Sequence, residues 1–204
     1  MTTLGEVRDR LRARLEDTSD APLWSDTTLD EGLQRALDAY SQWNPSESID
    51  TFTATDGDTS AALPSGETPA SGSRVLKVIA PNDDVIPPKA GESVGYTGDE
   101  EQSWTVFAGS LRFARPLSAG TYTVYSTGAR AWPAADESDF PVPESDLGLI
   151  LAGATVYALE VRVTQEWKRG PLPARYSEAI NEARAAYAAE WRERRRVIRV
   201  RHLA

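Results

Sequence analysis

The stretch Leu147–Leu159 reads LGLILAGATVYAL, and it has the strongest influence on the predicted fold. Its side chains are apolar on nearly every face of a helix, with small residues at Gly153 and Ala154. A helix of this kind is buried on several sides, because a surface helix keeps one polar face. We therefore expect a long central helix over about Glu144–Trp167.

Three other segments show the three- and four-residue spacing of apolar side chains that is typical of helices. They cover about Thr3–Glu16, Thr27–Trp43 and Pro173–Arg196. Neither the N-terminal nor the C-terminal pair of helices can bury its apolar faces without a further partner. We therefore predict that the helices from the two ends of the chain pack together.

Between the two helix pairs the apolar pattern becomes that of β-strands. Short runs rich in β-branched and aromatic residues are separated by Gly, Pro, Asn and Asp. The runs are Ile49–Thr55, Arg74–Ile79, Trp104–Phe107, Leu111–Phe113 and Thr121–Ser126. Ala108-Gly109-Ser110 predicts a hairpin between the third and fourth runs. Asp56–Ser73 has few large apolar residues and reads as a long loop.

The predicted fold class is α+β: a helical bundle formed by the N-terminal and C-terminal helix pairs, with an inserted small antiparallel β module. The expected domains are an N-terminal helix pair at 1–45 and the β module at 46–132. A C-terminal helix pair at 133–196 packs on 1–45, and an extended basic tail follows at 197–204.

Charge is distributed unevenly along the 204 residues, whose formal net charge is −9. Asn44–Ser110 holds eleven acidic residues against three basic ones. From Glu193 to the C-terminus there are five Arg and one Glu, a net of 5 − 1 = +4. This contrast indicates that the basic end meets a separate partner or an acidic surface of a neighbouring copy. A solvated, frayed end is the alternative.

The composition excludes several classes of protein. The chain has no Cys, so it has neither disulfides nor thiolate metal sites. Its N-terminal stretch is an amphipathic charged helix rather than an apolar signal segment. No run approaches the roughly 18 consecutive apolar residues that span a bilayer. We expect no membrane partner and a soluble protein made in the cytoplasm.

The sequence offers little catalytic chemistry. Its one histidine, His202, lies near the chain end, where no rigid surroundings would orient it. No nucleophile elbow, phosphate-binding loop or zinc-binding helix motif is present. Adjacent loop carboxylates such as Asp83-Asp84 are not held across a cleft. We predict no catalytic residue, no cofactor and no enzyme activity.

Two patterns in the sequence resemble binding sites, and each also has a simpler structural explanation. Four oxygen-bearing residues fit positions of a calcium loop, namely Asp56, Asp58, Ser60 and Glu67. Ala61 stands where that loop needs Gly and Pro64 interrupts it, so a solvated acidic loop is favoured and no metal is expected. Five aromatic residues could form a platform for sugars or bases: Tyr96, Trp104, Phe107, Tyr122 and Tyr125. Core packing is the favoured explanation, because the acidic surroundings would repel nucleic acid.

The end of the chain reads RRRVIRVRHLA from Arg194. Val197, Ile198 and Val200 interleave with arginines, a pattern typical of a strand. We predict an extended basic segment suited to adding a strand to another protein's sheet.

The order of these features resembles the head–tail adaptors, or head-completion proteins, of long-tailed double-stranded DNA bacteriophages. LWSDTTLDEGLQRALDAYSQW (Leu23–Trp43) is similar to their second helix. SLRFARPLSAGTYTVYSTGA (Ser110–Ala129) is similar to their paired strands, and FPVPESDLGLILAGATVYALE (Phe140–Glu160) to their third helix. The Asp56–Gly98 region matches nothing in that family, which leaves the role of the β insertion open.

The resemblance implies a structural protein of the virion neck, made in the host cytoplasm. Its partners would be the portal protein, the next neck or tail-completion protein, and further copies of itself in a ring of about twelve. DNA would pass through the ring without sequence-specific binding. The implied portal-docking residues are Arg194, Arg195, Arg196, Val197, Ile198, Arg199, Val200 and Arg201.

Two alternatives stand beside this interpretation. One is another neck component, a stopper or tail-completion protein, which would be a small β structure without long terminal helices. The other is a ligand-binding or carbohydrate-binding module that uses Trp104 and the tyrosines.

Overall fold

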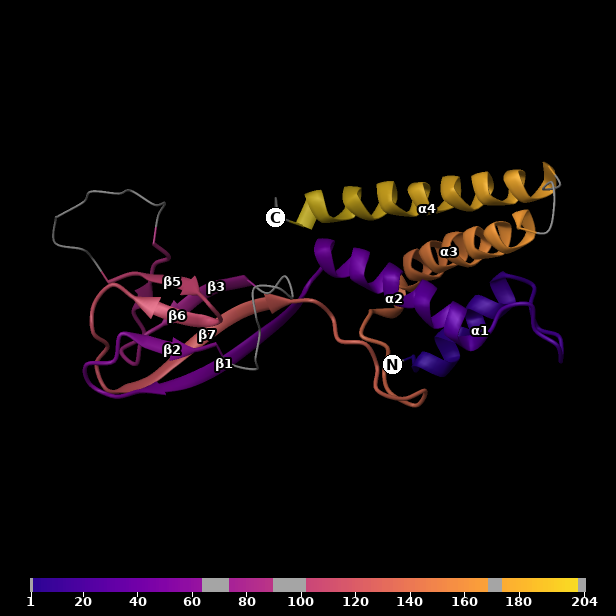
Figure 1. Ribbon diagram of the computed structural model, residues 1–204. Coiled ribbons are helices and arrows are strands. Elements are labelled where there is room, and N and C mark those ends of the chain that lie inside the picture. Colours follow the sequence, from indigo (N-terminus) through magenta and orange to yellow (C-terminus); the bar gives the residue numbers. More distant parts are fainter. Residues whose placement is uncertain (1, 64–73, 90–101, 169–173, 202–204) are drawn as a thin grey trace. The chain divides into compact units, whose positions relative to one another are not determined.

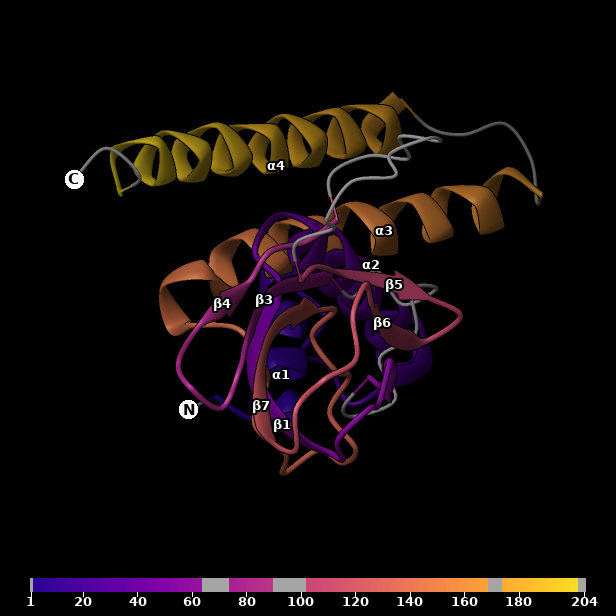
Figure 2. The same cartoon turned by 90° about the vertical axis from the view of Figure 1, so that its left-hand side faces the viewer.

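The computed structural model describes residues 2–63, 74–89, 102–168 and 174–201, and for α4 it describes the side chains from Tyr176 to Arg194. The chain forms two compact units. The helical unit comprises Met1–Tyr40 and Arg130–Ala204, and the β unit comprises Ser41–Ala129. Figure 1 shows the helices and most of the strands with the labels used below, and β4 is labelled in Figure 2.

Two helices begin the helical unit, and local sequence signals fix where each starts. In α1 (Leu4–Arg14), the Thr3 side chain accepts from the Glu6 backbone while the Glu6 carboxylate accepts from the Thr3 N–H. This reciprocal capping box satisfies two helix-end donors. In α2 (Asp26–Trp43), the Ser25 hydroxyl accepts from the Thr28 N–H at 3.2 Å. The apolar faces of both helices are fully buried at Leu11, Leu29, Leu33 and Leu37.

The long apolar segment forms α3 (Leu147–Trp167), preceded by a short 3-10 turn, η3 (Glu144–Asp146). The predicted central helix is confirmed. It packs against α1 and also against α4 (Ala174–Arg201), which runs antiparallel beside it (Figure 1). The Trp24 indole N–H donates to the carbonyl of Ala158 at 3.1 Å, which fixes the loop before α2 on the same helix.

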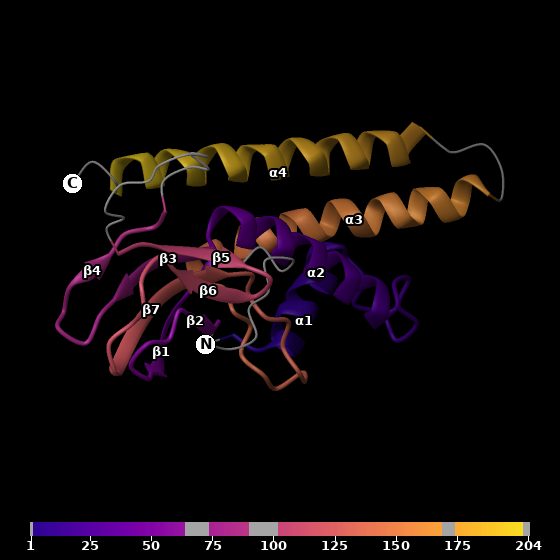
Figure 3. The ribbon, with the colours of Figure 1, turned by 60° about the vertical axis from the view of Figure 1, so that its left-hand side comes forward.

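The predicted helical bundle is wrong. The described residues form a mixed α+β fold with four α-helices and two antiparallel sheets. The main neighbour of α4 is α3, and Ile180 is the one buried side chain among those described in α4. The helices therefore lie in layers around α3 instead of closing around one common core (Figures 1 and 3).

Close contact between these layers depends on two glycines. A Cβ on Gly32 of α2 would lie 3.1 Å from the Tyr157 ring and 3.2 Å from the backbone oxygen of Ala154. A Cβ on Gly153 of α3 would lie 3.1 Å from both Ala36 and the Tyr187 ring. Such distances are tighter than ordinary van der Waals contact. Gly153 thus lies where α2, α3 and α4 meet.

The segment Glu144–Trp167 is also long and apolar enough to cross a membrane, by length and composition alone. The central helix of a globular protein gives the same signal, and α3 buries Leu147, Leu149 and Ile150 against its neighbours. Its second half carries Glu160 and Arg162. The composition of this helix is accounted for by its position between two layers.

A cluster of charges joins α1 to α2 and to the segment that leads into η3. The Arg8 guanidinium donates to both oxygens of Asp30 at 2.9 and 3.0 Å and to both oxygens of Asp136 at 3.0 Å. These bonds raise the pKa of Arg8 and lower the pKa of Asp136. The side chain of Arg8 is only 11% exposed, so the cluster replaces water around its charge.

The pH dependence of stability should report the Arg8 cluster and the separate bonds of Glu144. The pKa of Asp136 is lowered, chiefly by hydrogen bonds from Arg8, and that of Glu144 by hydrogen bonds from Thr2 and Arg10. A carboxylate with a lowered folded pKa stabilises the fold above its unfolded pKa, about 4, and this contribution is lost as pH falls through the folded value. In urea titrations, the stability gap between the parent chain and Asp136→Asn should therefore shrink below about pH 4. Asp20→Asn, at an exposed loop position, is the control; a gap that does not change with pH would contradict this.

The β unit contains two antiparallel sheets. The larger has the order β1-β7-β3-β4, built from β1 (Ser46–Ala54), β7 (Gly120–Gly128), β3 (Arg74–Ile79) and β4 (Val85–Ile86). The smaller has the order β2-β6-β5, built from β2 (Ser60–Ala62), β6 (Ser110–Phe113) and β5 (Trp104–Phe107). Figure 2 shows β1, β7, β3 and β4 side by side. This region is therefore more than a small module, because it has its own core.

Five predicted strands and the predicted hairpin are confirmed. Phe107 pairs with Ser110, and the turn residues Ala108 and Gly109 have φ of 49° and 74°. Two positive φ angles are typical of the tight turns that suit hairpins. The predicted loop at Asp56–Ser73 is wrong in part, since β2 lies within it and pairs with β6; residues 64–73 are outside the described residues.

The core of the β unit lies between the two sheets. Its largest members are Trp104, Phe113 and Tyr122, packed with aliphatic residues such as Val78, Leu111 and Val124. Phe52 stacks on Tyr122 with ring centroids 5.2 Å apart. The buried polar atoms of the aromatic residues are satisfied: the Trp104 indole N–H donates to Ile86 at 2.9 Å, and the Tyr122 hydroxyl donates to Ser118 at 3.1 Å.

Candidate docking site at the end of α4

All eight predicted docking residues, Arg194–Arg201, lie within α4. The prediction of an extended tail is wrong for Val197–Arg201, whose backbone is helical; the rest of the predicted tail, 202–204, lies outside the described residues. Arginine is a good helix former. Each β-branched residue lowers the stability of a helix by only about 0.5 kcal/mol, and here a long helix already precedes these residues. The helix therefore continues through the alternating pattern.

The one docking residue with a described side chain, Arg194, is bonded within its own chain. Its guanidinium forms an ion pair with Asp146 at 3.2 Å and donates to the Ser145 carbonyl. The Arg194 side chain is 28% exposed and that of Asp146 14% exposed. This geometry ties the last turns of α4 to the start of α3.

Asp146 uses its second carboxylate oxygen for α2. The Tyr40 hydroxyl donates to that oxygen at 2.7 Å, and the Ser145 hydroxyl donates to the first oxygen at 3.1 Å. The Arg130 guanidinium lies 5.3 Å from the centre of the Tyr40 ring and donates to the Pro141 carbonyl at 2.8 Å. We call Tyr40, Arg130, Asp146 and Arg194 the Asp146 cluster.

Aromatic packing supports the same end of α4. Tyr187 and Trp191 have ring centroids 6.1 Å apart at 65°, and Tyr187 covers Gly153 of α3. Earlier in α4, the Arg184 guanidinium forms an ion pair with Glu160 of α3 at 2.7 Å. These contacts hold α4 on α3 up to the basic segment, so that segment starts from a fixed position.

The other members of the Asp146 cluster were missed by sequence reasoning. Arg194 and Asp146 are 48 residues apart (194 − 146 = 48), and no spacing pattern links them. The sequence gives only a weak signal for the role of Asp146. It follows Pro143 at a predicted helix start, and the helix dipole favours an acidic side chain there whether or not it forms an ion pair.

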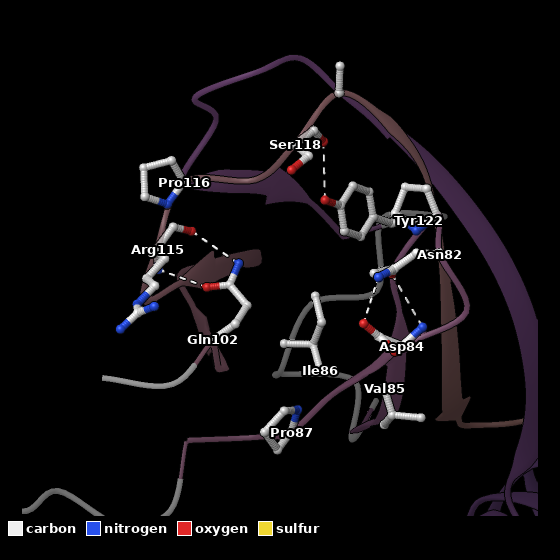
Figure 4. Close-up of a pocket in the computed structure, with 13 residues that line it drawn as sticks. Asn82, Asp84, Val85, Ile86, Pro87, Gln102, Arg115, Pro116, Ser118 and Tyr122 are labelled. Carbon is white, nitrogen blue, oxygen red and sulfur yellow. Dashed lines mark hydrogen bonds between the residues drawn. The ribbon is translucent and has the colours of Figure 1, made fainter. Parts of the chain in front are cut away.

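A hollow of about 650 Å³ in the β unit is lined by residues near β4 and the segment before β7. Figure 4 shows its polar side chains bonded locally: Gln102 with the Arg115 backbone, Asn82 with Asp84, and Tyr122 with Ser118. Within the described residues, no buried side-chain nitrogen or oxygen lacks a partner. Among the described residues that line it, the hollow therefore presents no unpaired buried side-chain nitrogen or oxygen to a ligand.

The proposed aromatic platform is not brought together. Trp104 and Tyr122 are buried in the core of the β unit, whereas Phe107 is 64% exposed. Tyr125 lies under Lys77, with the ammonium 5.6 Å from its ring centre, and Tyr96 is outside the described residues. This arrangement favours core packing and weighs against the carbohydrate-binding alternative.

The calcium-loop pattern has a structural explanation. Asp58 accepts hydrogen bonds from the Thr55 N–H at 2.7 Å and its hydroxyl at 2.8 Å, which closes the turn at Gly57. These bonds lower the pKa of Asp58. Glu67 is outside the described residues, and the described part of the chain contains no group of three or more acidic or His residues placed to hold a metal.

Comparison with known proteins assigns the chain to a family. A family model described as SU10 adaptor protein matches residues 2–202. No curated protein sequence matches the chain. An adaptor of this kind is a structural, non-enzymatic component of a phage particle that interacts with other head or tail proteins. The chain therefore belongs to the SU10 adaptor protein family, which confirms its resemblance to phage head–tail adaptors.

Proposed function

We propose that this protein is a head–tail adaptor that forms a ring beneath the portal of a tailed phage. The ring, of about twelve copies, joins the portal to the next neck or tail-completion protein and leaves a channel for DNA. The protein is made in the host cytoplasm and resides in the neck of the virion. The observation that carries the proposal is the adaptor family match over residues 2–202.

The charge distribution fits this role. The formal net charge of −9 disfavours adhesion to DNA phosphates, which suits a channel wall. The basic residues from Arg194 to Arg201 are grouped at one end of a long helix. Long terminal helices also weigh against the stopper alternative, which would be a small β structure.

Since Arg194 is bonded to Asp146 and Ser145, we assign it a positioning role. The proposed portal contacts are Arg195, Arg196, Val197, Ile198, Arg199, Val200 and Arg201, presented on the end of a helix instead of a strand. A partner for such an element is a groove with acidic walls.

Native mass spectrometry with the cognate portal ring tests the proposal. The full chain should give a complex of one portal ring with several adaptor copies. A chain ending at Arg196 keeps the Arg194 ion pair and should lose that complex. A chain ending at Arg192 is less informative, because it also removes Arg194 from Asp146.

A full-length charge reversal separates charge from length. Arg199→Glu with Arg201→Glu should abolish the portal complex, while Arg14→Glu, an exposed arginine of α1, should leave it intact. Equal binding by the full chain, the shortened chain and the charge reversal would remove the docking assignment. If the full chain itself binds no portal, the adaptor ring proposal fails as well.

A further inference from the structure

The side of α4 that faces away from α3 is a candidate contact surface. α3 is the main neighbour of α4, and Figures 1 and 3 show α4 at the outside of the helical unit. On the side away from α3, exposed residues follow one another at alternating steps of four and three, the spacing of the seam between paired helices. They are Glu178, Glu182, Ala185, Ala189 and Arg192. We call these five residues the outer face of α4.

Charges of opposite sign lie at opposite ends of the outer face. Glu178 and Glu182 are one turn apart in its first half, and Arg192 lies at the other end. Like charges four residues apart destabilise a helix. Neither Glu182 nor Arg192 has a residue of opposite charge three or four positions away along the sequence. α4 therefore supplies no neutralising neighbour on its own surface for either charge, and a partner helix could supply one.

A second copy of α4, laid antiparallel on the outer face, matches these charges. Glu182 and Arg192 are each five residues from position 187, so an antiparallel pair centred there places Glu182 of one copy opposite Arg192 of the other. Twofold symmetry repeats this contact. Ala185 and Ala189 are each two residues from the same centre and also fall opposite one another. Their short side chains allow the two helices to approach closely.

A parallel pair is disfavoured, because it would set Glu182 against Glu182 and Arg192 against Arg192. Charge complementarity thus selects both the occupant and its direction. One helix packed on one helix buries less area than a standard protein interface, so the association is weak and depends on concentration.

We propose that the outer face of α4 is a self-association surface, on which two copies of the free chain pair through antiparallel α4 helices. Such a pair is isologous, whereas a ring is built from head-to-tail contacts. The pair therefore separates before copies enter a ring. The surface lies before the proposed portal contacts, which begin at Arg195, and the inference goes beyond the proposed adaptor function without depending on it.

Reciprocal charge reversal in the full chain tests the pairing. Glu182→Arg alone, or Arg192→Glu alone, sets like charges opposite one another twice in each pair. Either should raise the dissociation constant of the pair at least about tenfold, as measured by sedimentation equilibrium. The double variant restores opposite charges and should pair like the parent. An equimolar mixture of the two single variants should form mixed pairs, which native mass spectrometry detects by their mass.

Asp20→Arg, at an exposed loop position of the same unit, is the control and should pair like the parent. Circular dichroism of each variant verifies that the helices are retained. A parent chain that stays monomeric at every concentration, or single variants that pair like the parent, would overturn the inference. So would single variants that fail to pair and do not recover on mixing, since the antiparallel register would then be wrong.

The chain that ends at Arg196 separates this inference from the docking assignment. It keeps the whole outer face of α4 and should pair like the parent, while it should lose the portal complex. Loss of pairing in this chain would place the contact beyond Arg196 and would also overturn the inference. Failure of the full chain to bind a portal leaves the pairing measurement unaffected, so the two proposals fail separately.

Discussion

Trp104→Ala should destabilise the β unit by about 4 kcal/mol, which is a large part of the stability of a domain of this size. The Trp104 side chain is 6% exposed and belongs to the core between the two sheets. Its removal leaves a cavity and also leaves the Ile86 carbonyl without the indole donor that bonds it at 2.9 Å. Urea unfolding, followed by the circular dichroism of the backbone instead of tryptophan fluorescence, measures the loss in free energy of unfolding.

Phe107→Ala is the matched control on the same strand. Phe107 is 64% exposed, and its ring meets only the Arg112 guanidinium, 5.6 Å from the ring centre, among its described ring contacts. The expected cost is within about 0.5 kcal/mol. Equal effects at Trp104 and Phe107 would contradict the assignment of Trp104 to the core, and would reopen the possibility of an exposed aromatic platform.

Gly32→Leu should destabilise the helical unit by about 3 kcal/mol, since overpacking forces α2 and α3 apart. The Cβ alone would lie 3.2 Å from the Ala154 backbone oxygen and 3.4 Å from its Cα, neither of which can rotate away. The gain in helix propensity on replacing Gly, about 1 kcal/mol, is smaller than this cost. The midpoint of thermal unfolding of the helical unit, followed at 222 nm, measures the change.

Gly148→Ala provides the comparison within the same helical unit. Its nearest neighbours to a new Cβ are the carboxylate oxygens of Glu190 at 3.9 and 4.0 Å, which is ordinary contact. The substitution should therefore be neutral or stabilise the unit by up to about 1 kcal/mol. A similar loss at Gly32 and Gly148 would show that the glycines matter for reasons other than the spacing between helices.

Elements with a strong local signal could be predicted from the sequence. The apolar run of α3, the hairpin turn at Ala108 and Gly109, and the strand Arg74–Ile79 each follow from a few adjacent residues. β2 and β4 could not be predicted, because three and two residues are too few to show a period. The functional assignment depends on the family resemblance. The composition and the lack of known catalytic motifs in the sequence do not by themselves indicate a function.

The errors came from non-local interactions. The prediction of a closed bundle rests on apolar stripes, and a stripe does not specify which helix covers it. In the structure Tyr187 of α4 covers Gly153 of α3, so α4 packs on one side of α3. The ion pair between Arg194 and Asp146 likewise depends on how α3 and α4 are aligned, which no single segment encodes. The extended tail was predicted from β-branched residues whose strand preference is weaker than the tendency of an established helix to continue.

The close approach of Arg130 to Tyr40 also bears on how such proteins diversify. The guanidinium lies 5.3 Å from the ring, so the two ends of the intervening eighty-nine residues (129 − 41 + 1 = 89) leave the helical unit at neighbouring points. Neighbouring ends are the condition under which a segment can be exchanged for a longer, shorter or unrelated one without disturbing its host. A segment of another length or fold could therefore replace the β unit while the helices keep their packing, and a laboratory graft at Ser41 and Ala129 could do the same.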